Sequence, residues 1–211
     1  MKPFALSGLV ARLRVLAARL ARDNRGVAAI EFAVIAPLML LMFFGTVEFS
    51  NGVAVDRKVS VMAQSLADLT SRYTAVTDTD VTNFFAAGNA IMTPYSTTHS
   101  ATALRATIVE LYIDPTNGSG RVQWSRGDEA ASLYPTATII SVPTGLVARD
   151  VSNNIIAGQY LILADVKYLY VPVVGYVMAT AGVTLTAVAY MRPRLSQCVL
   201  LNTTSGSCPV A

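Results

Sequence analysis

One uninterrupted apolar stretch, residues 27–47, constrains the fold of this chain more than any other feature. It holds 21 residues and a single ionisable side chain, Glu31. As an α-helix it would extend roughly 31 Å, about the thickness of the hydrocarbon core of a bilayer. Buried helices of soluble proteins rarely run this far without a polar face. The stretch therefore predicts a transmembrane helix that crosses the membrane once.

The distribution of charge orients this helix. Hydrophobic residues make up 53% of the 211 residues and charged residues only 14%, which excludes a disordered polyelectrolyte. Residues 1–26 hold six cations and one anion, whereas residues 27–211 hold ten cations and twelve anions. Because cations flank the cytoplasmic end of a membrane helix, we expect residues 1–26 to be a cytoplasmic basic leader and the rest to lie outside. Without a basic cluster beyond the leader, no nucleic-acid partner is expected.

The leader differs from an ordinary signal peptide. The apolar stretch is longer than the roughly 7–15 residues of a signal peptide, and Glu48-Phe49-Ser50 follows it in place of a small-residue cleavage site. Leucines of the leader recur at helical spacing, which favours a basic amphipathic helix on the inner leaflet. A leader that is simply removed is the alternative, and the sequence leaves both open.

Glu31 needs a partner, because a carboxylate inside a bilayer costs on the order of 2.5–3.5 kcal/mol. No Lys or Arg lies within residues 27–47. A cut after Gly26 would give Val27 a positive α-amino group, four residues before Glu31 and on the same helix face. That amine could pair with Glu31 of its own chain or with Glu31 of a neighbouring subunit.

These residues carry a specific resemblance. Residues 25–32, RGVAAIEF, resemble the processing site of type IV pilin-like precursors, with a glycine before the cut and a glutamate five residues after it. The longer run of residues 25–49 resembles the TadE-like family of the Tad (Flp-type) pilus system. The shared features are Gly-x-x-x-x-Glu-Phe, a proline six residues after the glutamate, and a Gly-x-x-Glu-Phe exit, carried by Gly26, Glu31, Phe32, Pro37, Gly45, Glu48 and Phe49.

The resemblance implies a bacterial inner-membrane protein with a periplasmic C-terminal domain. It implies a minor pilin or pseudopilin that prepilin peptidase cuts between Gly26 and Val27. Glu31 and Phe32 would then dock the subunit against other pilin or pseudopilin subunits and Tad assembly proteins. The family also contains membrane-anchored assembly factors, so an uncleaved scaffold is the alternative. The subunit could enter the fibre, sit at its tip or remain in the membrane.

The helical pattern continues beyond the membrane over residues 48–72. Apolar residues there recur every three or four positions: Val55, Val59, Met62, Leu66, Leu69 and Tyr73. This stripe predicts packing against the protein's own sheet or against other helices in a fibre. On the opposite face Asp68 can pair with Arg72. Pro37 should kink the membrane half of the helix.

Residues 73–211 predict a small α+β domain of the pilin-like kind, with an antiparallel sheet. A short helix is expected over 81–90, capped by Thr79 or Asp78. Strands are expected over 103–113, 121–125, 159–171 and 182–191. Residues 168–191 carry no charge and are long enough for a second membrane span. Pro172, Gly175 and Gly182 favour two strands and a turn instead.

Little in the sequence indicates catalysis. Cys198 and Cys208 could form a disulfide in the periplasm, and two free thiols are the alternative. His99 is the only histidine, and no nucleophile elbow, phosphate loop or metal-binding motif is present. We therefore expect no catalytic residues, no metal, no cofactor and no small-molecule substrate. A membrane-tethered enzyme would need an active-site cluster that the sequence does not display.

Overall fold

The computed structural model describes residues 26–95, 104–128, 133–172, 182–203 and 206–209. The predicted leader up to residue 25 and His99 therefore lie outside the described residues. The chain divides into two compact units at Val47/Glu48. The second unit, Glu48–Ala211, is the C-terminal domain.

Helix α2, Val27–Ser71, contains the apolar stretch and its amphipathic continuation. Within residues 27–47 the large apolar side chains are exposed on every side of the helix, including the consecutive run Leu38–Phe44. A helix this long and apolar could span a membrane. Pro37 lies inside the helix, which continues through it as regular α-helix. The expected kink at Pro37 stays a prediction.

The second half of α2 packs on the C-terminal domain. Its stripe residues Val55, Val59, Met62 and Leu66 are fully buried, together with the small Ala63 and Ala67. The stripe therefore contacts the protein's own core, as one of the two predictions had it. Leu69 is only partly buried and Tyr73 is exposed, so the buried stripe ends one turn earlier than expected. The predicted Arg72–Asp68 ion pair is present at 2.5 Å.

Helix α3, Asp78–Met92, begins with a reciprocal cap. The Thr77 side chain accepts a hydrogen bond from the Asp80 backbone, and the Asp80 carboxylate accepts one from the Thr77 backbone at 2.9 Å. The expected cap at Thr79 or Asp78 is therefore wrong. Thr77 and Asp80 have the spacing of a capping box, which satisfies two backbone donors at once. Asp78 instead receives the Arg126 guanidinium, with Nε at 2.6 Å.

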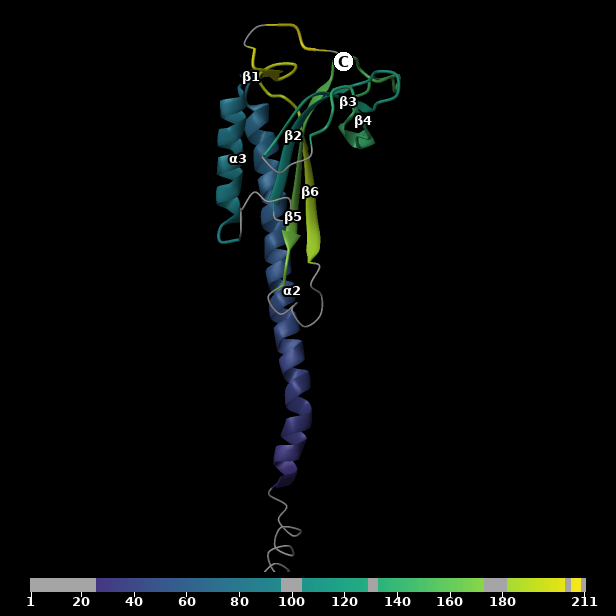
Figure 1. The fold of residues 1–211 in the computed structure, drawn as a ribbon. Helices are drawn as coiled ribbons and strands as arrows, with labels where there is room; N and C mark the ends of the chain where they lie inside the picture. Colours follow the sequence, from purple (N-terminus) through teal and green to yellow (C-terminus); the bar gives the residue numbers. More distant parts are fainter. Residues whose placement is uncertain (1–25, 96–103, 129–132, 173–181, 204–205, 210–211) are drawn as a thin grey trace, which may run out of the picture. The chain divides into compact units, whose positions relative to one another are not determined.

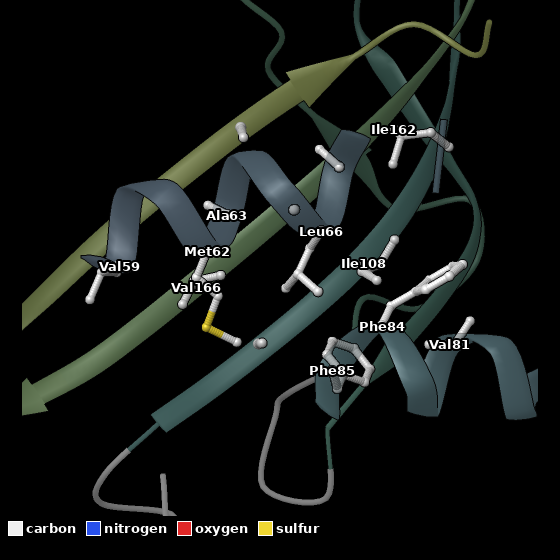
Figure 2. Packing of buried hydrophobic residues seen from close by; sticks show 14 of the residues in the cluster. Val59, Met62, Ala63, Leu66, Val81, Phe84, Phe85, Ile108, Ile162 and Val166 are labelled. Carbon is white, nitrogen blue, oxygen red and sulfur yellow. The ribbon is translucent and has the colours of Figure 1, made fainter. Parts of the chain in front are cut away.

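Five strands form one antiparallel sheet in the order β4-β3-β2-β5-β6 (Figure 1). The strands are β2 Leu104–Ile113, β3 Gly120–Gly127, β4 Ile139–Ile140, β5 Tyr160–Tyr170 and β6 Val183–Met191. Helices α2 and α3 cover one face, where Met62, Leu66, Phe84 and Phe85 meet Ile108, Ile162 and Val166 (Figure 2). A 3-10 turn, η2 Thr144–Leu146, belongs to the chain segment that covers part of the other face. This is an α+β layout, as the sequence predicted.

Strands β5 and β6 decide between the two predictions for residues 168–191. They pair antiparallel from Ile162↔Met191 to Tyr170↔Val183. Both ends of the uncharged segment are thus strands in the same sheet, with residues 173–181 between them outside the described part. Two strands therefore account for this segment, and the second span is not supported.

The C-terminal segment returns to the end of α2. Strand β7, Leu200–Leu201, pairs in parallel with β1, Ala75–Val76. The Arg194 backbone N–H donates to the Ser71 carbonyl at 2.8 Å, and the Arg194 guanidinium contacts Asp68. These contacts tie Arg194 and β7 to the region where α2 ends.

Candidate functional site

The predicted processing and docking residues lie together at the start of α2. Gly26 precedes the helix, Val27 is its first residue, and Glu31 and Phe32 follow just beyond the first turn. All four are exposed. A Cβ atom built on Gly26 would meet nothing within 4 Å. The backbone around Gly26 is therefore open to an approaching protein.

Glu31 is the only charged group of the apolar half of α2. Within the described part of the chain it has no hydrogen-bond or ion-pair partner. Its neighbours Ile30, Phe32, Val34 and Ile35 are apolar and exposed. Such a helix combines an apolar surface that water does not favour with one unsatisfied carboxylate. Chemically, this arrangement can bind another apolar helix that brings a cation.

A second glutamate marks the end of the apolar stretch. The Tyr170 hydroxyl donates to Glu48 Oε2 at 2.8 Å, which joins the end of β5 to the first residue of the C-terminal domain. Burial, and then the Glu48 carboxylate, raise the pKa of Tyr170 to about 12, so its hydroxyl stays a donor. Sequence reasoning placed Glu48 in the family pattern without assigning it a contact. No sequence signal links it to Tyr170, because 122 positions separate the two.

A third glutamate, Glu110 of β2, is completely buried beneath the C-terminal segment. It lies opposite Trp124 of β3 in the sheet. Glu110 Oε1 accepts from the Val199 backbone N–H at 2.5 Å, and Trp124 Nε1 donates to the Val199 carbonyl at 2.8 Å. Two side chains thus satisfy both backbone groups of one residue. Burial raises the pKa of Glu110 to about 7, against the opposing effect of the hydrogen bond from the Val199 backbone.

Sequence reasoning missed Glu110, although a signal was present. The alternation along β2 puts it on the same face as Ala106 and Ile108, which pack against the helices. A carboxylate on the buried face of a strand needs a buried donor. The sequence did not show which face of β2 is buried against the helices, because both faces of the strand are mostly apolar.

Cys198 and Cys208 form a disulfide, with their Cα atoms 5.7 Å apart. The bond closes a loop directly beside Val199. The sulfur atoms therefore reinforce the same C-terminal segment that Glu110 and Trp124 hold. This is a structural contribution with no reactive thiol, since the chain contains no other cysteine.

The described residues offer no site of clear chemistry. No group of three or more His, Cys, Asp or Glu side chains among them could hold a metal ion. A small pocket of about 200 Å³ lies beside Asp165 and Lys167 of β5. There the Tyr134 hydroxyl donates to Asp165 Oδ2 at 2.8 Å, and Lys167 Nζ lies 3.2 Å from the same oxygen. Burial, and then Asp165, raise the pKa of Tyr134 to about 12, so its hydroxyl stays protonated.

Fold and site together define a class of protein: an α+β domain whose first helix extends into an exposed apolar segment with one isolated carboxylate. The comparison with protein families found a match that begins at the start of this helix. Residues 26–68 match the model of the TadE-like protein family, which confirms the resemblance over the apolar segment and most of the amphipathic continuation. The match indicates a component associated with the Tad pilus. Searches of curated proteins and of solved structures returned no match.

Proposed function

We propose that this chain is a TadE-like minor pilin or pseudopilin, a structural and assembly component of the Tad (Flp) pilus and not an enzyme. The observation that carries the proposal is the family match over residues 26–68, which begins at the glycine of the predicted cut. Residues 27–47 anchor the protein in the bacterial inner membrane, with its N-terminus in the cytoplasm and its C-terminal domain in the periplasm. Prepilin peptidase removes residues 1–26.

The mechanism follows from the isolated carboxylate. Cleavage after Gly26 leaves a positive amine on Val27 and a free Glu31 four residues later. In a low-dielectric membrane an unpaired carboxylate and an unpaired amine attract strongly. Pairing the amine of one subunit with Glu31 of the next satisfies both, while the exposed apolar side chains of residues 27–47 pack helix against helix. The C-terminal domain then presents its surface to further assembly proteins.

The experiment determines the N-terminus of the protein isolated from native membranes, with and without prepilin peptidase. A start at Val27 that depends on the peptidase supports the proposal. A start at Met1 under both conditions overturns the cleavage step and identifies the uncleaved, membrane-anchored scaffold instead.

Two glycines supply a matched pair of variants for this experiment. Neither Gly26 nor Gly45 has a neighbouring atom within 4 Å of a built Cβ, so leucine at either position leaves the chain's own packing intact. Gly26→Leu should abolish the cut because the peptidase must accommodate the residue before the scissile bond. Gly45→Leu should be cut as the parent is. Equal processing of both variants would contradict cleavage at Gly26.

A further inference from the structure

Strand β5 ends at Tyr170, beside the first two turns of the C-terminal domain. Besides the hydrogen bond from Tyr170 to Glu48, the Tyr170 ring lies over Gly52, where a built Cβ would stand 3.7 Å from Cε1. The end of β5 therefore stays close to the residues that directly follow the apolar segment of α2.

The surface that these elements form is apolar and exposed. Phe49 and Val53 of α2 are 74% and 45% exposed, and Val171 and Val183 beside the end of β5 are 53% and 56% exposed. We call these four residues the exit patch. Phe49, Val53 and Val183 line a shallow groove of about 440 Å³, whose charged lining residues among those described are the acids Glu48 and Asp56. Exposed apolar patches of this kind mark binding surfaces.

The position of the exit patch along the chain points to its occupant. At 1.5 Å per residue, Phe49 and Val53 stand about 3 and 9 Å beyond Val47 along the helix. The headgroup region of a bilayer is roughly 5–8 Å deep on each side of the hydrocarbon core. If residues 27–47 cross the membrane, which rests on the proposed function, Phe49 lies at headgroup depth. The Val53 side chain leans toward the N-terminal end of the helix, as all helix side chains do, and so reaches the outer edge of the headgroups.

We propose that the exit patch rests on the lipid surface, with its apolar side chains inserted among the headgroups. Interfacial binding of this kind scales with the apolar area inserted. Because the charges at the groove are negative, the patch suits zwitterionic lipids and gains nothing from anionic ones. The contact gives the C-terminal domain a second attachment to the membrane besides α2.

The test measures the depth of single spin labels by their accessibility to oxygen, which partitions into lipid, and to a water-soluble nickel complex. The full-length protein is studied in bilayers of phosphatidylcholine. Its native cysteines are bonded to each other and do not react with the label. A label at Val183→Cys should be several-fold more accessible to oxygen than to nickel. A label at Phe49→Cys, on the helix side of the patch, should give the same result.

Val151→Cys is the matched control, because Val151 is an equally apolar residue of the same domain, 107% exposed and away from the patch. Its label should favour nickel. If Val183 and Phe49 also favour nickel, or if they are shielded from both reagents by another protein, the proposal is overturned.

A label at Leu40→Cys, inside the apolar segment, separates this proposal from the proposed function. Lipid-type accessibility at Leu40 with water-type accessibility at Val183 overturns the exit patch alone. Water-type accessibility at Leu40 overturns the membrane span, and the patch with it. Adding phosphatidylglycerol should leave the Val183 result unchanged, and a marked deepening there would contradict the zwitterionic preference.

Discussion

Glu31 and Glu110 are both carboxylates in apolar surroundings, but they differ in whether a hydrogen-bond donor lies nearby. Glu110 finds its donor inside the domain, at the backbone of Val199. Glu31 finds none among the described residues and stands exposed on α2. The first therefore contributes to the stability of the fold, and the second is available for assembly. Substitutions at the two positions should affect different measurements.

Replacing Glu110 by Gln should change how stability depends on pH. Burial raises the pKa of Glu110 from 4.5 to about 7, so between these values the folded chain binds more protons than the unfolded chain. The free energy of unfolding of the parent therefore falls as pH rises through this window, by roughly 3 kcal/mol. Glu110→Gln does not titrate, so its stability relative to the parent should rise across the window by about that amount.

Urea unfolding followed by the fluorescence of Trp124, the only tryptophan, measures this directly. Asp150→Asn serves as the control. The backbone N–H of Asn154, foremost among its donors, lowers the pKa of Asp150, so its contribution is lost only in more acidic solution. Parallel curves for Glu110→Gln and the parent would show that Glu110 is ionised in the folded state throughout.

Replacing Glu31 by Ala should impair pilus assembly and leave the domain intact. Removing one partner of a desolvated charge pair costs about 2–5 kcal/mol, so pilus numbers should fall by about tenfold or more. Glu31→Gln, which keeps the size and loses the charge, should fail similarly. Urea unfolding of both variants should match the parent. Normal piliation in Glu31→Ala would count heavily against pairing with the amine.

At the scale of elements, Met62 and Gly88 couple α2 to α3. A Cβ on Gly88 would lie 2.9 Å from Met62 Cε, at the flexible end of that side chain. Met62→Ala should cost about 2–5 kcal/mol through the cavity it leaves. In that background Gly88→Ala should stabilise the protein by about 1 kcal/mol, because alanine favours the helix and fills space. In the parent the same change should stabilise less, because Met62 must move.

A double-mutant cycle of the unfolding free energies checks this coupling. Gly145→Ala is the control, since no atom lies within 4 Å of a built Cβ there and its effect should add to that of Met62→Ala. Strict additivity for Gly88 would show that the two helices do not share this contact in solution.

The elements that the sequence predicted well are those with long, regular patterns. The stripe from Val55 to Leu66 and the strands over 103–113 and 159–171 repeat their periodicity often enough to be distinctive. The pairing of β1 with β7 was not predicted, because two residues carry no periodicity. Residues 168–191 stayed ambiguous, because an uncharged run of that length fits a span as well as two buried strands.

The candidate site likewise has a part that the sequence predicts and a part that it does not. Residues 26–32 form a local motif and could be predicted, because their chemistry depends on spacing along a single helix. The contacts of Glu48 and Glu110 could not, because each joins residues far apart in sequence, to Tyr170 and to Val199 respectively. Such contacts depend on the order and register of the strands, which local patterns do not determine.

At the scale of the whole molecule, the disulfide secures the segment that closes the C-terminal domain. In the chain-entropy model a loop of this size contributes roughly 2–3 kcal/mol. The double variant Cys198→Ala/Cys208→Ala should lose about that much unfolding free energy, measured by urea unfolding with Trp124 as the probe. Dithiothreitol should weaken the parent similarly and leave the double variant unchanged. An unaltered midpoint in the variant would show that the bond adds nothing to folding.

The contacts between the end of α2 and the C-terminal segment also determine when the domain can finish folding. The backbone N–H groups of Leu200 and Asn202 donate to the carbonyls of Thr74 and Val76. The neighbouring Val199 is part of the hydrophobic core. Among the described core residues, Val199 is the last to be translated, so the core packed around α2, α3 and the sheet is completed late. Such high contact order slows folding and prolongs the exposure of apolar surface. We therefore expect truncation before Val199 to leave the core open, even though every strand of the five-stranded sheet would be present.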